Sequence, residues 1–351
     1  MAVGLVFGLI RYTMENSLGK IKAYWRSGVS YGLGLEKSLG GPITVHIETT
    51  NICNFRCVYC PQSMPDEHFK KLGRGKMSLD TFKIILSKIM NAWPLREIVL
   101  TRDGEPLVHP ELDKFIAHAS AQGLDITIGS NGSYFTPERS QRLIDSGLTK
   151  VKGDFCSDKQ KYEQLRVGAD WEKVLDGYRS LVRYAVEQHK KFYLVLVDLC
   201  TYGLSDTDAI QHSLQNLRQL FPFPDEYLAI GPAMMHNAFD EAQEILSTSS
   251  KLTRQKYNRC HHPWIELVID YKGNAVGCCR DLRSEYILGN IVSCTDVEQD
   301  IWNGQAMRHL RKQLRKKVPE NITICNKCDL PYGVSYAGSG IFNKYIRFLK
   351  R

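Results

Sequence analysis

The chain has 351 residues, of which 43% are hydrophobic and 24% are charged, with 11 cysteines and a net charge of +8. This composition is that of a soluble globular protein with one large domain or two smaller ones, and no apolar run is long enough to span a bilayer. The apolar start, MAVGLVFGLIRY, has no basic residues ahead of it and no small-residue cleavage site, so it predicts a helix and not a signal peptide. We therefore expect a cytoplasmic protein whose clustered thiols bind metal.

Positive charge gathers at the C-terminal end of the sequence. Residues 305–351 hold eleven lysines and arginines against two acidic residues, which gives this segment a charge of +9. One interpretation is a solvated helix face followed by a basic tail. The other is a docking surface for an anionic partner, such as a phosphorylated substrate, an acidic peptide or a membrane surface touched through basic termini. No zinc-finger, homeodomain or RNP pattern is present, so we expect no nucleic-acid partner.

Strands and helices alternate from residue 43 to about residue 232. The expected strands are ITVHIE (43–48), EIVLT (97–101), LDITIGS (124–130), 149–155, FYLVLVDL (192–199) and YLAI (227–230). Helices are expected from Ser78, near 111, over 136–146, from Trp171 and from Asp206. This alternation predicts parallel βαβ units in a barrel or an open α/β layer, with the functional loops at the carboxyl ends of the strands.

The pattern changes on either side of this unit. Residues 1–42 are expected to form an N-terminal helical extension, and 233–259 a connecting segment. Residues 260–330 predict a small cysteine-bearing domain that opens with a hairpin over 264–279 and continues with a helix through Met307, Leu310 and Leu314. Residues 331–351 form the basic tail.

Three cysteines follow the first expected strand in the stretch CNFRCVYC. Cys53, Cys57 and Cys60 are separated by three and then two residues. Thiolates bind zinc and iron–sulfur clusters, and a structural zinc site or a four-iron cluster usually takes four protein ligands. Three cysteines therefore leave one coordination position for a ligand that is not part of the protein.

This spacing resembles the signature of the radical S-adenosylmethionine (radical SAM) superfamily. The resemblance implies a 4Fe-4S cluster held by Cys53, Cys57 and Cys60, with S-adenosylmethionine (SAM) at the open position. In that family the reduced cluster cleaves SAM to methionine and a 5′-deoxyadenosyl radical, which abstracts a hydrogen atom from the substrate. It also implies an α/β fold with a partial (β/α)6 TIM-like barrel, and a flavodoxin- or ferredoxin-type reductant.

Two further motifs carry the resemblance at the ends of the second and third expected strands. Asp103-Gly104-Glu105-Pro106 stands where the family has a glycine-rich motif for the SAM amino group, and it departs from the two-glycine version at Asp103. Ser130-Asn131-Gly132 matches the motif near the SAM ribose. The resemblance therefore implies SAM-binding roles for Gly104, Glu105, Ser130 and Asn131.

Two single residues are matched in the same way. Tyr59 precedes the third cysteine, at the position of the aromatic residue beside the adenine in the family. Arg166 stands where many members have an arginine beyond the fourth strand, and its guanidinium suits the SAM carboxylate. The alternative to the radical SAM interpretation of these motifs is a zinc-binding loop that occurs by chance on an α/β protein.

A second set of cysteines follows in the small domain. Cys260, Cys278 and the pair Cys325 and Cys328 resemble the auxiliary-cluster extension called SPASM, or its shortened form, Twitch. Since no cysteine follows Cys328, the resemblance implies the Twitch-like version with one auxiliary 4Fe-4S cluster. A structural zinc knuckle is the alternative. Two cysteines, at positions 279 and 294, remain unassigned, and either could replace one of the four ligands.

The reaction depends on the fate of the substrate radical. Loss of a proton and an electron gives dehydrogenation, and return of a hydrogen atom from a thiol gives epimerisation. Cys156 and Cys200 lie at expected strand ends, so each is either a candidate hydrogen donor or a small buried core residue. We expect a sugar- or aminocyclitol-like small-molecule substrate. The alternatives are a maturase of ribosomal peptides or proteins and a non-catalytic iron–sulfur electron carrier, which would need no SAM motifs.

Overall fold

The computed structural model describes residues 25–63, 69, 72–202, 204, 206–233, 257–326 and 328. Most of the expected N-terminal extension, nearly all of the connecting segment and the basic tail lie outside these residues. Residues 25–33 are helical. Within the described chain, none of the helices combines the length and the apolar character needed to cross a membrane.

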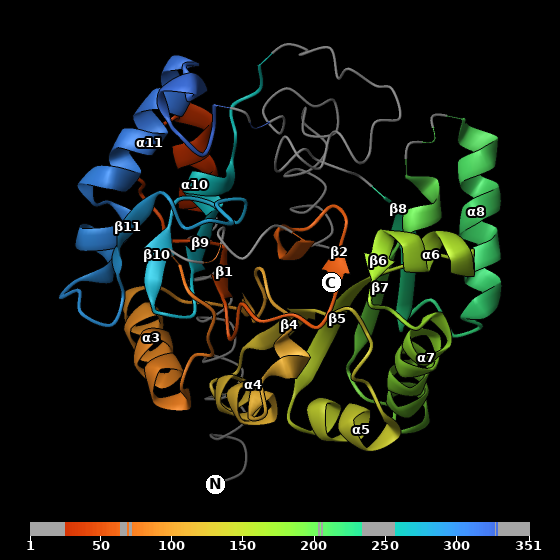
Figure 1. The fold of residues 1–351 in the computed structure, drawn as a ribbon. Coiled ribbons are helices and arrows are strands. Elements are labelled where there is room, and N and C mark those ends of the chain that lie inside the picture. The colour runs from red at the N-terminus through yellow and green to blue at the C-terminus, as the bar shows by residue number, and fades with distance from the viewer. Residues whose placement is uncertain are drawn as a thin grey trace, which may run out of the picture.

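The six expected strands form one parallel sheet, which confirms the predicted α/β class. They are β1 (Thr44–Ile47), β3 (Glu97–Val99), β4 (Asp125–Gly129), β5 (Leu148–Phe155), β7 (Tyr193–Asp198) and β8 (Leu228–Pro232), hydrogen-bonded in this order. Together with the helices outside it, this sheet has the arrangement of a partial TIM-like barrel (Figure 1).

Five of the helices that connect the strands lie where the sequence predicted them, and α6 (Lys159–Leu165) was not predicted. The five are α3 (Leu79–Ala92), α4 (Leu112–Ala121), α5 (Pro137–Asp145), α7 (Trp171–Glu187) and α8 (Thr207–Leu220), and short turns form at η1 (Pro61–Ser63), η2 (Pro106–Val108) and η3 (Leu199–Thr201). Side chains cap several of these helices. The Ser78 hydroxyl accepts a hydrogen bond from the Thr81 N–H, and the Asp170 and Asp206 carboxylates do the same for α7 and α8. Such caps satisfy backbone donors that a helix leaves free, so the start positions could be read locally.

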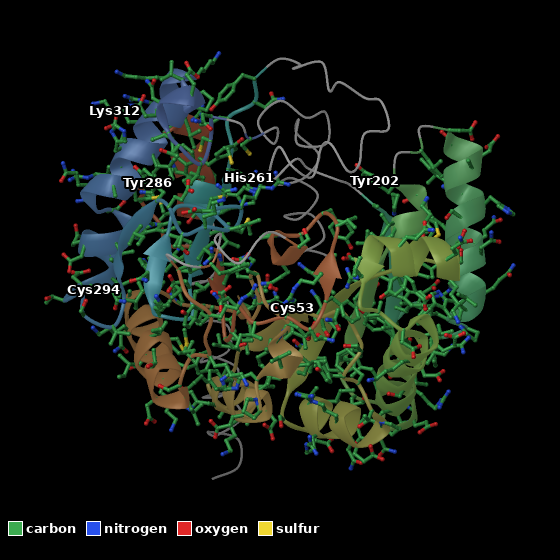
Figure 2. All side chains as sticks on the ribbon, viewed as in Figure 1. Cys53, Tyr202, His261, Tyr286, Cys294 and Lys312 are labelled. Carbon is green, nitrogen blue, oxygen red and sulfur yellow. A yellow bond between two sulfur atoms is a disulfide. The ribbon has the colours of Figure 1, made fainter. Side chains whose placement is uncertain are left out.

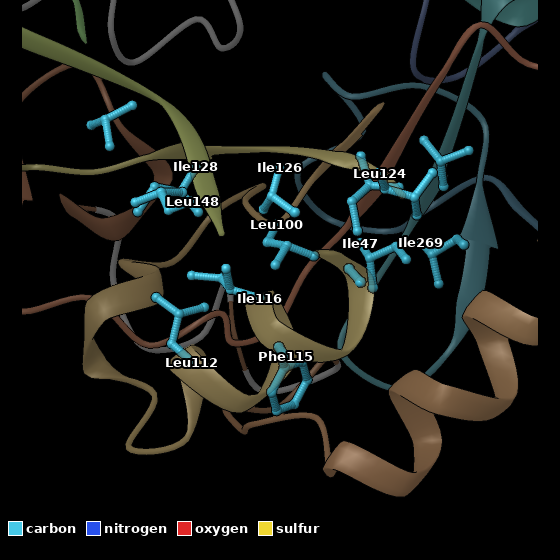
Figure 3. Packing of buried hydrophobic residues seen from close by; sticks show 14 of the residues in the cluster. Ile47, Leu100, Leu112, Phe115, Ile116, Leu124, Ile126, Ile128, Leu148 and Ile269 are labelled. Atoms are coloured by element: carbon cyan, nitrogen blue, oxygen red, sulfur yellow. The ribbon is translucent and has the colours of Figure 1, made fainter. Parts of the chain in front are cut away.

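The core lies between the sheet and these helices. Ile47 of β1, Leu100 just after β3 and Ile126 of β4 point toward Phe115 and Ile116 of α4, and all five are fully buried (Figure 3). Burial of each such side chain contributes about 1.5–3 kcal/mol. Along β1, β3 and β4 the alternate residues face the opposite side of the sheet, which leaves that side free for loops and polar groups.

The cysteine-bearing region adds three strands to the same sheet. The hairpin strands β9 (Glu266–Ile269) and β10 (Asn274–Val276) are antiparallel, and β11 (Ile287–Asn290) follows. β9 also pairs in parallel with β1, so the sheet has nine strands in the order β11-β10-β9-β1-β3-β4-β5-β7-β8. The remaining elements are α10 (His262–Ile265), η4 (Val297–Trp302, a π-helix), α11 (Gln305–Lys316) and η5 (Pro319–Asn321). The barrel and the small domain therefore share one sheet and one core.

A second, two-stranded sheet was not expected from the sequence. β2 (Arg56–Cys57) lies within the cysteine loop and pairs antiparallel with β6 (Arg166–Val167). Strands of two residues show no hydrophobic period, so local pattern could not reveal them. This pairing joins the cysteine loop to the segment after α6.

Candidate functional site

The first three cysteines lie in the loop after β1, in the middle of the molecule, where Figure 2 labels Cys53. Cys57 is buried, and Cys53 and Cys60 are partly buried. Burial raises the pKa of Cys53 to about 11, and it raises the pKa of Cys60, to which the charges of Cys57 and Cys53 add. The three thiols therefore lie close enough to oppose one another's ionisation. A bound cation would remove this penalty, because thiolates are the form that binds iron. The donor set fits an iron–sulfur cluster.

Arg166 stands opposite Cys57 in the small sheet. Its Nη1 donates to the hydroxyl of Tyr59 at 2.8 Å and to Oδ2 of Asp154 at 2.6 Å. Burial by itself would lower the pKa of Arg166, but Tyr59, Cys57, Tyr162 and Asp154 raise it well above its usual value, so the guanidinium stays charged. Tyr59 and Arg166, which the sequence assigned separately, thus form one contact. Asp154, which the sequence did not assign to the site, could have been found from its position near the carboxyl end of β5, where functional side chains are expected. Their roles toward SAM stay predictions.

The DGEP loop packs against the backbone of the segment between β1 and the cysteines. A Cβ at Gly104 would overlap the carbonyl oxygen of Thr50, so only glycine fits. At Asp103, where the family has a second glycine, the N–H donates to Oε1 of Glu48 at 3.1 Å, and the side chain is buried beside Arg102. The departure from the two-glycine motif is therefore accommodated, because this side chain has a buried cationic partner.

Glu105 joins the DGEP loop to the Ser130-Asn131-Gly132 loop, the two loops that the sequence predicted to bind SAM. Its Oε1 accepts from the Ser130 hydroxyl at 2.9 Å, and its Oε2 accepts from the Asn131 N–H at 2.6 Å. The Asn131 amide in turn donates to Oδ1 of Asn54 at 2.9 Å and lies 3.9 Å from the sulfur of Cys53. Three loops that are distant in the sequence thus meet around the first cysteine. Burial raises the pKa of Glu105, while the hydrogen bonds that it accepts lower it.

The second cysteine set also comes together. Burial raises the pKa of Cys260 well above its usual value, and the nearby charges of Cys278, Cys328 and Cys325 raise it further. The four thiols are donors of the kind and number that one iron–sulfur cluster takes. The sequence prediction of these four ligands is thus consistent with their proximity, and their identity as ligands stays a prediction.

The two unassigned cysteines differ in their surroundings. The sulfur of Cys279 lies 3.8 Å from Nδ1 of His262, and a hydrogen bond from its side chain to Cys278 is the main reason that the pKa of Cys278 falls to about 6. Cys294 donates to the carbonyl of Ile291 and lies well away from His261, which neighbours Cys260 (Figure 2). Cys279 is therefore the residue that competes with Cys278, and Cys294 is not placed to do so.

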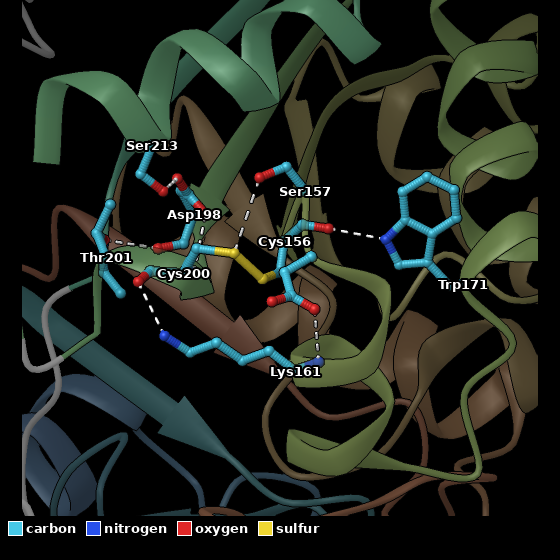
Figure 4. The surroundings of a disulfide bond; sticks show 10 residues. Cys156, Ser157, Lys161, Trp171, Asp198, Cys200, Thr201 and Ser213 are labelled. Carbon is cyan, nitrogen blue, oxygen red and sulfur yellow. Dashed lines mark hydrogen bonds between the residues drawn. A yellow bond between two sulfur atoms is a disulfide. The ribbon is translucent and has the colours of Figure 1, made fainter. Parts of the chain in front are cut away.

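Cys156 and Cys200 are joined by a disulfide with a Cα–Cα distance of 5.2 Å (Figure 4). Cys156 and Cys200 follow the adjacent parallel strands β5 and β7. Because Phe155 lies opposite Asp198 at the ends of these strands, the two cysteine side chains come together. The sequence interpretation treated them as two separate thiols. This is corrected by the structure, because a disulfide sulfur carries no hydrogen atom to donate. Either residue can act as a donor only after the bond is reduced.

The described part of the basic segment is not uniformly a solvated face. Arg311 is fully buried, donates to the carbonyl of Pro263 at 2.9 Å and to Oδ1 of Asn303 at 3.0 Å, and stacks over Trp302. Burial lowers the pKa of Arg311 to about 9. One of the eleven basic residues therefore serves packing. The charge at residues 329–351 lies outside the described residues.

Two family models match the chain. The radical SAM superfamily matches residues 47–211, and SPASM, an iron–sulfur cluster-binding domain, matches residues 260–329. A GTP 3′,8-cyclase of Campylobacter fetus subsp. fetus is 36% identical over 111 residues, which cover 30% of this chain and 32% of the cyclase. The chain spans half or less of the cyclases that it matches in this way.

One relative matches over most of its length. The S-adenosyl-L-methionine-dependent 2-deoxy-scyllo-inosamine dehydrogenase of Niallia circulans is 24% identical over 292 residues, which cover 81% of this chain and 92% of the dehydrogenase.

Solved structures show the same fold. BtrN in complex with AdoMet and 2-DOIA superposes with a TM-score of 0.54 at 19% identity, covering 82% of this chain and 93% of BtrN. Native anSMEcpe with bound AdoMet superposes with a TM-score of 0.53 at 13% identity, covering 82% of this chain and 89% of that one. With the cysteine loop, the DGEP and SNG motifs and the auxiliary cysteines in place, the chain carries a radical SAM domain, with SAM and a 4Fe-4S cluster as cofactors, and a SPASM-type iron–sulfur domain after its barrel.

Proposed function

We propose that this enzyme dehydrogenates a carbinol carbon of a sugar- or aminocyclitol-like small molecule. The observation that carries the proposal is the match to the 2-deoxy-scyllo-inosamine dehydrogenase, which covers 81% of this chain and 92% of that protein. The matches to the cyclases cover a half or less of those proteins and support only the shared radical chemistry.

The reaction removes two hydrogens from the substrate in separate forms. When bound, the cluster and SAM supply a 5′-deoxyadenosyl radical that takes a hydrogen atom from the carbinol carbon, and an auxiliary iron–sulfur group supplies an acceptor for one electron. The hydroxyl proton leaves to a base, and the C–OH bond becomes C=O. A flavodoxin- or ferredoxin-type protein is the proposed source of the electron that starts the reaction.

The side of the sheet that faces the cysteine loop suits a polar substrate. On β5, Val151, Gly153 and Phe155 are buried, and a Cβ at Gly153 would meet the ring of Tyr178 on α7. The alternate residues Lys150, Lys152 and Asp154 therefore point to the other side, where Asp154 contacts Arg166. Charged side chains on this side can hydrogen-bond hydroxyl and amino groups, which is consistent with a sugar-like ligand.

The test is to follow the substrate carbon. Reconstituted enzyme is incubated anaerobically with SAM, a reductant and a panel of aminocyclitols that carry deuterium at the carbinol carbon. We expect one deuterium in 5′-deoxyadenosine and a product lighter than its unlabelled parent by two hydrogens. A product of unchanged mass that takes up deuterium from D2O would overturn dehydrogenation in favour of epimerisation.

Epimerisation is the second candidate, and one observation favours it. Cys156 and Cys200 are held at the ends of adjacent strands, on the face where the fold places its functional loops. If the disulfide is reduced, either thiol could return a hydrogen atom to a substrate radical. A maturase of ribosomal peptides is supported only by shared fold, since SuiB bound to precursor peptide SuiA superposes at 14% identity and a TM-score of 0.52.

A further inference from the structure

One arginine connects the SAM-binding side of the barrel to the auxiliary domain. Arg102 directly precedes the DGEP loop, and its side chain is 1% exposed. Its Nη1 donates to the hydroxyl of Ser284 at 3.0 Å, and its Nη2 donates to the backbone carbonyl of Asp281. Both acceptors lie in the loop that follows Cys278 and Cys279. This contact spans about 180 residues of sequence.

Two buried carboxylates hold the guanidinium in place. Oδ2 of Asp103 lies 3.2 Å from Nη2 of Arg102, and Oε2 of Glu48 lies 3.7 Å from Nη1. Burial raises the pKa of both carboxyls, and the Arg102 charge lowers it. Arg102 is thus a cation fixed by its acidic neighbours in a site from which water is excluded, and a fixed fork of donors is well suited to set the position of a loop.

The same group joins four segments of the chain. Glu48, at the end of β1, also accepts hydrogen bonds from the backbone N–H groups of Asp103 and of Tyr271 in the β9–β10 turn. Asp281 uses its own carboxylate to accept from the N–H groups of Glu285 and Tyr286, which closes the auxiliary loop on itself. The contact from Arg102 therefore holds a preformed loop against a preformed site.

We infer that Arg102 is a positioning residue that fixes the auxiliary cysteine loop, residues 278–286, against the SAM-binding loop. The inference rests on the proposed dehydrogenation, and it concerns how the electron acceptor is held relative to the substrate radical. Arg102 lies two residues before Gly104, and Asp281 lies three residues after Cys278, so little chain separates this contact from either group of cofactor ligands. Movement of the loop would leave hydrogen abstraction intact and slow removal of the electron.

The test uses charge-matched variants, since removal of the cation alone would leave two buried carboxylates unpaired. The double variant Arg102→Met/Glu48→Gln removes the guanidinium and one negative charge, and Arg102→Lys keeps the charge but not the fork. The control is Lys88→Met. Lys88 also bridges the barrel to the auxiliary domain, through the carbonyls of Val292 and Cys294 at 2.7 Å, but it lies away from the predicted ligands.

Two measurements are made on each anaerobically reconstituted protein. Hydrogen exchange without substrate should quicken across residues 278–286 in the double variant and not in Lys88→Met. With substrate, 5′-deoxyadenosine formation should stay near that of the native enzyme, while product formed per deoxyadenosine falls by roughly tenfold to a hundredfold, as for a misplacement of about 1 Å. For Arg102→Lys, the product formed per deoxyadenosine should lie between the values for the native enzyme and the double variant.

Each negative outcome is distinct. If hydrogen exchange across residues 278–286 is unchanged in the double variant, the Arg102 contact does not hold the loop in place and the inference is wrong. Faster exchange with an unchanged yield per deoxyadenosine would show that the contact is structural only and overturn the positioning role. Because exchange needs no substrate, it remains decisive for the loop even if the native enzyme oxidises no aminocyclitol, which would instead refute the proposed function.

Discussion

At the scale of single residues, steric contacts and hydrogen bonds decide which motif positions tolerate substitution and which do not. Gly104 cannot carry a Cβ, because backbone and not a movable side chain occupies the space. Asp103 can differ from glycine, because its side chain points to Arg102. The family motif therefore contains one position fixed by backbone contact and one that this chain uses differently.

Gly104→Ala tests this distinction. The added methyl group would displace the DGEP loop or the Thr50 carbonyl, so SAM cleavage should fall by roughly a hundredfold or more. Gly28→Ala is the matched control, since nothing lies within 4 Å of a Cβ there. Deoxyadenosine formation and SAM binding by calorimetry are the measurements. Normal SAM binding by Gly104→Ala would show that the loop relaxes more easily than its packing indicates.

The Cys156–Cys200 disulfide permits a second test at this scale. Cys156→Ala and Cys200→Ala each remove the bond and leave one thiol. If the enzyme is a dehydrogenase, both variants should form deoxyadenosine and oxidised product at native ratios, because oxidation needs no thiol donor. If one variant still forms deoxyadenosine but loses the normal product, its missing thiol is the hydrogen donor. Alkylation of the native protein before and after reduction, read by mass spectrometry, reports whether the pair is oxidised.

At the scale of elements, helix caps and hydrophobic periodicity predicted the helices and strands whose signals lie within the element itself. Ser78, Asp170 and Asp206 begin helices in the structure, and each accepts a hydrogen bond from the N–H three residues on. β2 and β6 could not be predicted, since each is formed only by pairing with the other across more than 100 residues. That pairing places Arg166 beside Tyr59.

Two adjacent cysteines follow the β9–β10 hairpin. β10 ends at Val276, and the side chain of Cys279 hydrogen-bonds to that of Cys278 and lowers the pKa of Cys278, which favours Cys278 as the thiolate that binds the cluster. Cys279→Ala should retain about eight irons per chain, as expected for two four-iron clusters, and Cys278→Ala should fall toward about four. Iron and sulfide content after anaerobic reconstitution is the measurement. The reverse result would mean that Cys279 is the ligand, and about twelve irons in the native protein would contradict a single auxiliary cluster.

At the scale of the whole molecule, the auxiliary domain is part of the barrel's sheet. The pairing of β9 with β1 carries the sheet across the boundary. Trp302 of η4 and Arg311 of α11 bind the segment before β1 by donating to the carbonyls of Gly40 and Glu36. Movement between the two cysteine regions is therefore limited by one continuous core. Arg102 is one contact between these regions, and the exchange experiment measures its share.

The sequence by itself determined the class of chemistry, a radical SAM reaction, because the cysteine spacing and the DGEP and SNG motifs each lie within a few consecutive residues. It also determined the parallel α/β unit, because hydrophobic period and helix caps act over one turn or one strand. Only the tertiary structure decided that Glu105 joins the DGEP and SNG motifs, that Cys156 and Cys200 form a bond, and that Arg102 reaches Asp281. These contacts join residues 25 to 179 positions apart, and no local pattern encodes such a pairing, since it depends on how the strands stack in the sheet.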